Sequence, residues 1–342
     1  MPHLEVRNRS GFAYESLLLA DEEGVPQFAP LVQGSYAITT AGEISLLEEQ
    51  PAPPVAGEWH GDPGLSSPRL EPQIAFIKLA TDIVMLGSAH APQAGTTRMQ
   101  VGIRVGHVQK IVNVTGTRRL VSRSGVSHIS DPEPFETVPL RYECAFGGWD
   151  RRAQHPDEHR CEARNPVGVG FRNGSLRTDD ELLLPSIEDA GHAFQSYGDA
   201  PPPAGFGFIA PNWQPRAAFA GTFDSAWDRS RKPLLPRDFD RRFYNAASPG
   251  LIAQGYLRGD EAVVTIGASP AGRVAFELPC SSPPACTVEL RGRNRVELRT
   301  VLDTVIVDMD RMLLALQWRA HLPVRNGMDD VVSIEILPGA PT

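Results

Sequence analysis

The chain of 342 residues has only four cysteines and no long hydrophobic run. The cysteines are too few and too irregularly spaced for the disulfide framework of a small secreted protein. No apolar stretch approaches the roughly 20 residues that span a bilayer, and the N-terminal MPHLEVRNRS lacks the apolar core of a secretory signal. We therefore expect a cytoplasmic protein that does not bind a membrane, with free thiols at Cys144, Cys161, Cys280 and Cys286.

Basic residues do not outnumber acidic ones, and they are not gathered in one stripe. The chain has 33 Lys and Arg against 41 Asp and Glu, which gives a formal net charge of −8. Proteins that bind nucleic acid usually carry a concentrated positive surface, so we expect no nucleic-acid partner. Glycine and proline are in excess, with 31 of each, which predicts many turns and long ordered loops.

Short strand-like blocks dominate both ends of the chain. Alternating or β-branched apolar residues recur within residues 1–148 and again within 255–342, and the short connectors favour antiparallel pairing. LLALQWRA, near the C-terminus, could form a helix, but it shows no clear apolar stripe and its neighbours favour a strand. We expect a mainly β fold with antiparallel sheets and a sandwich-like core, built from these N-terminal and C-terminal regions.

The central segment, residues 149–254, is rich in proline, glycine and aromatic residues and has little periodicity. Three of the five tryptophans lie there, and disordered segments are poor in aromatics, so we expect the segment to be ordered by packing on the β core. Two short helices are predicted within it. Asp224 is the expected N-cap of the first helix and Asp238 that of the second, where Phe239 and Phe243 are four residues apart.

TDIVMLGSAHAP, residues 81–92, combines an aspartate, a serine and a histidine, as a hydrolase would. Its apolar run ends in Gly87, which predicts a strand that leads into a turn. A strand advances about 3.3 Å per residue, so Asp82 and Ser88 would lie roughly 20 Å apart, too far for a catalytic triad. The serine also lacks the Gly-x-Ser-x-Gly frame of a nucleophile elbow. We expect Asp82 and His90 to hydrogen-bond backbone groups of the turn instead.

Two other clusters have the composition of binding motifs but not their spacing. The glycines of NPVGVGFRNG, residues 165–174, do not follow the frame of a phosphate-binding loop. His155, His159 and Cys161 could hold zinc with Cys144 as a fourth ligand, although their polar segment is more typical of a solvated loop. We therefore expect no metal, no nucleotide and no other cofactor.

Several segments, taken in order, resemble the signature segments of a bacterial family of unknown function encoded beside type VI secretion genes. They are TDIVMLGSAHAP, VPLRYECAFGGWD, NPVGVGF, PPPAGFGFIAPNWQPR, AGTFDSAWDRSRKPLLPRDFDRRFYN and DTVIVDMD followed by LQWRAHLP. The resemblance covers nearly the whole chain. Two positions depart from the family pattern: Cys144 stands where arginine is usual, and Phe208 where proline is commoner.

This resemblance implies a non-enzymatic adaptor or chaperone. Such a protein holds a toxic effector and helps to load it onto the VgrG spike or its PAAR-repeat tip. The family has no established catalytic residues, so the resemblance supplies no active site. The alternative is a β-sandwich hydrolase or carbohydrate-active enzyme whose carboxylate, serine or histidine groups meet only in the fold.

The partner is expected to bind the stretch AGTFDSAWDRSRKPLLPRDFDRRFYN, residues 220–245. This stretch combines aromatic residues with a local excess of positive charge, a composition that interface hot spots favour. The expected contact residues are Trp227, Arg231, Arg237, Phe239, Arg241, Arg242, Phe243 and Tyr244. An exposed Trp227 would be a binding residue, whereas a buried one would stabilise the fold.

Overall fold

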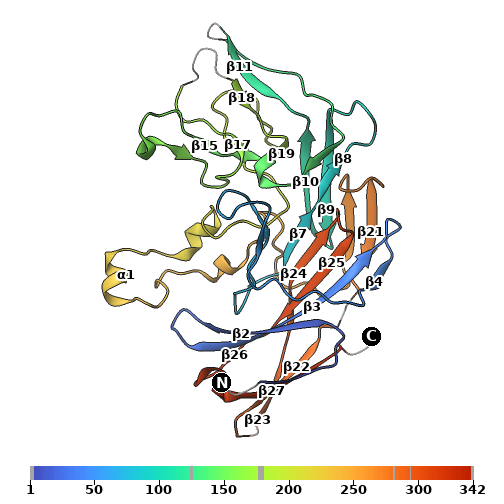
Figure 1. Ribbon diagram of the computed structural model, residues 1–342, viewed down its shortest axis with the longest axis vertical. Coiled ribbons are helices and arrows are strands. Elements are labelled where there is room, and N and C mark those ends of the chain that lie inside the picture. Colours follow the sequence, from blue (N-terminus) through green and yellow to red (C-terminus); the bar gives the residue numbers. More distant parts are fainter. Residues whose placement is uncertain (1–3, 124–125, 176–180, 280–281, 293, 340–342) are drawn as a thin grey trace.

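The computed structural model describes residues 4–123, 126–175, 181–279, 282–292 and 294–339. Strands make up most of its regular structure and the helical segments are short, which confirms the mainly β prediction (Figure 1). Three larger sheets are accompanied by several sheets of two or three strands. Within the described residues, no helix is both long enough and apolar enough to cross a membrane.

The largest sheet, the main sheet, joins strands from both ends of the chain in the order β2–β3–β25–β24–β7. These strands are β2 (Ala13–Ala20), β3 (Pro26–Ile38), β25 (Leu313–Arg319), β24 (Val301–Asp308) and β7 (Asp82–Leu86), and β4 (Ile44–Leu46) and β26 (Leu322–Pro323) also pair with β3. The LLALQWRA segment is therefore strand β25, as its neighbours predicted. Two adjacent strands of the C-terminal region, β25 and β24, therefore lie between strands of the N-terminal region in this one sheet.

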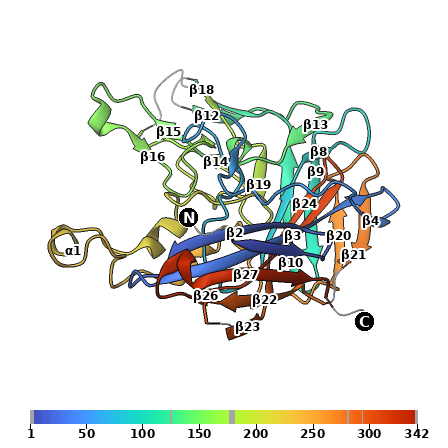
Figure 2. The same ribbon diagram turned by 60° about the horizontal axis from the view of Figure 1, so that its bottom comes forward.

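A four-stranded sheet packs on one face of β2 and β3, so this part of the molecule is a sandwich (Figure 2). Its strands, in spatial order, are β1 (Glu5–Asn8), β27 (Val331–Leu337), β22 (Ala285–Leu290) and β23 (Asn294–Leu298). Phe28 and Val32 of β3 share a buried cluster with Val288, Ile334 and Ile336 of the opposing sheet. Burial of these apolar side chains from both sheets holds the two layers together.

The third of the larger sheets has five strands. Its strands, in spatial order, are β19 (Ile187–Asp189), β10 (Val108–Thr115), β9 (Arg98–Val105), β20 (Ala262–Ile266) and β21 (Arg273–Glu277). Val101, Val112 and Val263 of this sheet belong to the largest buried cluster, together with Ile83 and Trp318 of the main sheet. The two sheets therefore share one hydrophobic core.

The remaining elements are short. The three-stranded sheet contains β12 (Val126–Ile129), β11 (Arg119–Arg123) and β18 (Glu181–Leu183), and the strand pairs are β8 (Ser88–His90) with β13 (Thr137–Pro139), β14 (Phe146–Gly147) with β17 (Val169–Gly170), β15 (Trp149–Asp150) with β16 (Arg160–Cys161), and β5 (Glu58–Trp59) with β6 (Pro68–Leu70). The helical segments are the α-helix α1 (Ser225–Ser230) and the 3-10 turns η1 (Tyr142–Cys144), η2 (Pro156–Glu158), η3 (Arg216–Ala220), η4 (Arg241–Tyr244) and η5 (Gly327–Asp330).

The central segment supplies part of the core. Phe206, Phe208 and Trp213 are buried in the largest cluster, as the aromatic content predicted. The segment also covers the free edge of β7, because the backbone N–H of Ile83 donates to the carbonyl of Leu251 at 2.9 Å. It is therefore ordered by packing against β7 and by backbone hydrogen bonds to it.

Most strand pairs are antiparallel, as expected, but three are parallel and the second predicted helix is wrong in detail. Pairing is parallel in β1–β27, β7–β24 and β14–β17, because each of these strands meets a partner from elsewhere in the chain and not its neighbour in sequence. The second helix is a single 3-10 turn that starts at Arg241, and its N-cap is Asp240. Asp238 does not cap it, because its carboxylate binds Thr222 instead.

Candidate functional site

Residues 221–239 form an arm that projects from the body of the molecule (Figures 1 and 2). Asp238 closes its base by accepting hydrogen bonds from the backbone N–H and the hydroxyl of Thr222, at 3.0 and 2.7 Å. Gly221 has a φ of 81°, and a Cβ atom at this position would meet Pro236. Glycine therefore allows the tight turn that brings the two ends of the arm together.

The arm has a small core of its own. The α1 helix is capped as predicted, because the carboxylate of Asp224 accepts a hydrogen bond from the backbone N–H of Trp227. The Trp227 ring lies edge-to-face against Phe223, with 4.8 Å between centroids, and its indole N–H donates to the carbonyl of Leu234 at 2.8 Å. Trp227 is half-buried, so it closes the arm internally and presents only part of its ring to solvent.

Two arginines tie the arm and its base to the turn between β2 and β3. Arg231 pairs with Glu23 at 2.7 Å, and Arg241 pairs with Glu22 at the same distance. Hydrogen bonding to Arg241 holds the pKa of Glu22 below its usual value, and Arg231 does the same for the pKa of Glu23. These two guanidinium groups therefore form ion pairs within the protein.

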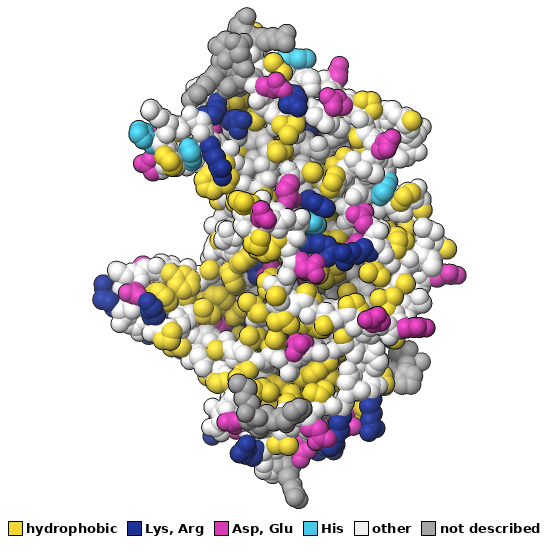
Figure 3. All heavy atoms as spheres, viewed as in Figure 1, with side chains coloured by type: hydrophobic (Ala, Val, Ile, Leu, Met, Phe, Trp, Pro, Cys, Tyr) yellow, Lys and Arg dark blue, Asp and Glu magenta, His cyan; other side chains and the backbone are white. Residues whose placement is uncertain are grey.

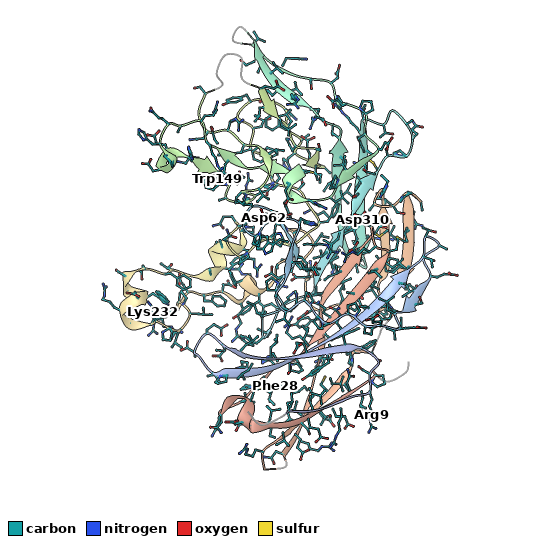
Figure 4. All side chains as sticks on the ribbon, in the orientation of Figure 1. Arg9, Phe28, Asp62, Trp149, Lys232 and Asp310 are labelled. Atoms are coloured by element: carbon teal, nitrogen blue, oxygen red, sulfur yellow. The ribbon has the colours of Figure 1, made fainter. Side chains whose placement is uncertain are left out.

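Two of the four remaining basic residues in this region, Lys232 and Arg242, are also paired. Arg242 contacts Asp240 at 2.6 Å, and Lys232, on the outer part of the arm, contacts Asp228 at 3.1 Å (Figure 4). Arg237 is exposed. The local excess of positive charge that the sequence indicates is thus largely neutralised in the fold.

The aromatic residues after the arm pack against one another. Phe239, Phe243 and Tyr244 have ring centroids 5.4 to 6.3 Å apart, and Tyr244 also meets Phe76 edge-to-face at 5.6 Å. All three are half-buried, and burial raises the pKa of Tyr244 to about 12. The structure therefore brings the predicted aromatic residues together, and their mutual packing joins the arm to the body.

An apolar pocket of about 310 Å³ opens near these aromatic residues. Figure 3 shows hydrophobic side chains gathered where the arm joins the body. Leu79 and Ile252 expose 44% and 40% of their surface there. The pocket lining comprises Leu79, Ala80, Ile209, Pro215, Arg216, Phe219, Arg242, Asn245, Ala247, Pro249 and Ile252. An apolar pocket with exposed large apolar residues at its rim is typical of a docking site.

A buried arginine and an exposed one hold the walls of this pocket in place. The Arg216 guanidinium pairs with Glu71 at 2.5 Å and donates to the carbonyls of Ile209 and Phe243, each at 2.8 Å. The Arg242 guanidinium lies 4.3 Å from the centre of the Phe219 ring. The pocket is therefore formed before any partner arrives.

Asp82 stabilises the same wall from beneath. Its fully buried carboxylate accepts hydrogen bonds from the Lys78 ammonium at 2.9 Å and from the Asn245 side chain and the Ala246 backbone N–H at 3.0 Å. Asn245 lines the pocket. The expectation for Asp82 needs correction, because the backbone group that it binds belongs to Ala246 and not to the turn after β7.

The serine and histidine of TDIVMLGSAHAP do not form a catalytic set. Ser88 and His90 lie on β8, and the Ser88 hydroxyl donates to Asp310 at 3.2 Å. In the part of the chain that the structure describes, no hydrogen bond joins Ser88 to His90. The side chains of this strand therefore lack the nucleophile and base contact of a hydrolase.

A serine and a lysine do meet elsewhere, which the sequence did not indicate. The Lys110 ammonium donates to the Ser248 hydroxyl at 2.6 Å, and the Tyr142 hydroxyl donates to it at 2.8 Å. Burial lowers the pKa of Lys110 to about 8. Ser248 has no exposed surface and donates to the carbonyl of Gly205. The trio has the composition of an activated nucleophile, but Ser248 is closed to substrate.

The candidate zinc residues are not assembled into a site. The Nε2 atom of His159 lies 3.2 Å from the carbonyl oxygen of Ala153, and Cys161 pairs through its backbone with Trp149. Among the residues for which a position is described, no three His, Cys, Asp or Glu side chains are grouped to hold a metal. The thiols of Cys144, Cys161 and Cys286 are free, whereas Cys280 lies outside the described residues.

The glycines of NPVGVGFRNG have a packing role. Val169–Gly170 forms strand β17, which pairs in parallel with β14. A Cβ atom on Gly168 would lie 2.5 Å from the carbonyl oxygen of Ala145. The glycines therefore let two backbone segments approach closely.

Sequence reasoning missed the apolar pocket. Leu79, Phe219 and Ile252 come from three separate stretches of the chain, and Phe219 and Ile252 lie in the central segment on either side of the predicted interface. The available signal was weak, since an isolated exposed leucine or isoleucine is common on protein surfaces. Arg242 is the one predicted contact residue that lines the pocket.

The fold and this site define a mainly β protein with a preformed apolar pocket. The chain belongs to a family described as uncharacterized proteins conserved in bacteria, DUF2169, whose model matches residues 23–319. This match confirms the resemblance to a bacterial family of unknown function. No curated protein and no solved structure matches the chain.

Proposed function

We propose that the protein is a non-enzymatic adaptor or chaperone that binds a toxic effector and helps to load it onto the VgrG or PAAR component of a type VI secretion spike. The apolar pocket is the observation that carries this proposal. It is preformed, it has two large exposed apolar residues at its rim, and few polar side chains line it. Such a surface suits an apolar side chain of a partner protein better than a polar substrate.

The internal contacts of Trp227 argue against a role for this residue in partner binding. That ring completes the arm's own core, and the arginines Arg231 and Arg241 hold the β2–β3 turn. Arg242 remains at the pocket, beside the apolar rim residues Leu79 and Ile252. We place the partner on the pocket, with the arm beside it as a wall.

A hydrolase receives less support from the same geometry. The Ser88 hydroxyl donates a hydrogen bond to Asp310, and no histidine contacts it among the described residues. Ser248 is fully buried. Neither arrangement offers a nucleophile that is both activated and reachable. The adaptor function therefore remains the proposal.

The test measures binding of the purified chain to purified effector, VgrG and PAAR-repeat proteins from the same bacterium. We expect the Ile252→Asp variant to weaken binding at least about tenfold, because it places a charge at the rim of the apolar pocket. Leu65→Asp is the matched control, since Leu65 is 73% exposed and does not line the pocket. If the native chain binds none of the three proteins, the proposal is refuted. Equal losses for both folded variants would place the contact elsewhere.

A further inference from the structure

The strand β2 is the outermost strand of the main sheet, and within the described residues only β3 pairs with it. The hairpin fixes which backbone groups face outward. The N–H of Asp21 donates to the carbonyl of Val25 at 3.1 Å, so the odd-numbered residues of β2 bond to β3. The outward N–H and carbonyl groups therefore belong to the even-numbered residues Tyr14, Ser16, Leu18 and Ala20.

Contacts on both sides of the hairpin agree with this alternation. Pro30 has no N–H and lies opposite Ser16, where no hydrogen bond to β2 is required. The Pro30 carbonyl instead accepts from Ala320 on the far side of β3, at 3.2 Å. The outward N–H of Ser16 donates to the side chain of its neighbour Glu15 at 3.1 Å. The Ser16 N–H therefore points away from β3, where an added strand could accept its hydrogen bond in place of Glu15.

The edge of β2 also lacks the usual protection against strand pairing. Exposed edges are commonly guarded by lysine, proline or a bulge, and β2 has none of these. Its sequence, AYESLLLA, contains a single charge, on Glu15. By comparison, the outer strand β1 carries Glu5 and Arg7, and the outer strand β23 carries Arg295 and Glu297. β2 is thus a long, regular and nearly uncharged edge.

We propose that β2 pairs with β2 of a second copy of this chain, antiparallel across a two-fold axis at Leu17. In this register Ser16 lies opposite Leu18 of the partner subunit, so the outward backbone groups of each copy meet those of the other. Glu15 then faces Leu19 of the partner subunit, which keeps the two carboxylates from opposing each other. The two main sheets become one continuous sheet, and this pairing does not depend on the adaptor function.

The first test measures the mass of the full chain by sedimentation over a range of concentrations. We expect the native chain to dimerise as concentration rises. Ser16→Pro removes one outward N–H and no bond to β3, so it should raise the dimer dissociation constant about tenfold or more. Ser16→Ala keeps the N–H and should behave as the native chain does. A native chain that stays monomeric at every concentration overturns the proposal, as does a folded Ser16→Pro variant that dimerises normally.

The second test fixes the register and does not need a proline variant. Directly opposed residues that are not hydrogen-bonded have Cα atoms about 4.5 Å apart, within the range that a disulfide can bridge. Leu17→Cys should therefore form a cross-linked dimer on mild oxidation. Leu19→Cys is the matched control, because four residues of offset place the two sulfur atoms roughly 13 Å apart. Oxidation of the native chain under the same conditions is a second control, which measures any cross-linking through the native cysteines. Cross-linking of Leu19→Cys equal to or above that of Leu17→Cys overturns the two-fold axis at Leu17.

Discussion

Lys78 and Asp82 form an ion pair of 2.9 Å in which neither side chain exposes more than 2% of its surface. The Lys78 ammonium also donates to the Thr304 hydroxyl at 2.7 Å, and Asp82 holds Asn245 and Ala246. The pair thus joins two neighbouring strands of the main sheet to the wall of the apolar pocket. Among the described residues, both buried charges have their hydrogen-bond partners within this network.

Removal of the lysine should strongly destabilise the protein. Lys78→Met leaves the Asp82 carboxylate buried without its counter-charge, which costs about 3–5 kcal/mol of the free energy of unfolding. Lys232→Met is a matched control, because Lys232 forms an ion pair of the same spacing with Asp228 and both side chains are 59% exposed. The control should cost less than about 1 kcal/mol. Urea unfolding measures both, and similar losses in the two variants would contradict the buried network.

Loss of the Trp227 ring should open the arm without unfolding the body. The contacts of this ring are with Phe223, Lys232 and Leu234, all within the arm. We expect Trp227→Ala to leave the urea midpoint nearly unchanged and to increase the rate of trypsin cleavage within residues 221–239. Trp149→Ala is the control, because Trp149 is 43% exposed and lies outside the arm, and it should change neither. A large loss of global stability would show instead that Trp227 supports the main core.

Lys110 should make a contribution to stability that increases with pH in the alkaline range. Burial lowers the folded pKa of this lysine to about 8 from an ordinary value of 10.5. Between these values the unfolded chain binds more protons than the folded one, so the free energy of unfolding increases with pH. The raised pKa values of Tyr244 and Cys286 act in the opposite direction, but the native chain and Lys110→Met share them. We therefore expect the difference in free energy of unfolding between the native chain and Lys110→Met, measured by urea unfolding, to shift in favour of the native chain as pH rises from about 8 to 10.5. Identical pH profiles would rule out the lowered pKa.

Acid should release the base of the arm from the β2–β3 turn. The pKa of Glu22 is lowered chiefly by its hydrogen bond to Arg241, so the contact is complete above the usual carboxyl pKa and is lost as pH falls through the lowered one. Arg241→Ala should remove this acid dependence and expose the arm to trypsin at neutral pH. Arg242→Ala is the control, because Arg242 pairs within its own turn with Asp240. Equal trypsin sensitivity of the two variants would contradict the anchoring role of Arg241.

Local patterns explain which parts of the fold could be predicted. Strand alternation and β-branching identify β3 and β9, whereas β25 is identified through its β-rich neighbours. The cap at Asp224 depends only on backbone groups two and three residues away. Asp238 has the same residue type, but a tertiary contact with Thr222 uses its carboxylate, so the predicted cap fails.

Tertiary contacts explain what could not be predicted. Arg231 and Arg241 look available in the sequence, yet their partners Glu23 and Glu22 lie more than two hundred residues earlier in the chain. The apolar pocket likewise requires the segments around Leu79 and Ile252 to meet, and no periodicity within either segment encodes that meeting. A single sequence shows side-chain types, whereas the pairing of charges follows from the fold.

The interleaved order of the main sheet constrains how the chain can be synthesised. β7 leaves the ribosome early, but its neighbour β24 begins at Val301 and β25 ends at Arg319. At about 5–20 residues per second, translation from Leu86 to Val301 takes roughly 10–40 s. During that interval the apolar side chains of β7 have no sheet to join, so the nascent chain must be kept from aggregating. A chain truncated before residue 301 should therefore be an insoluble fragment and should not form a smaller folded domain.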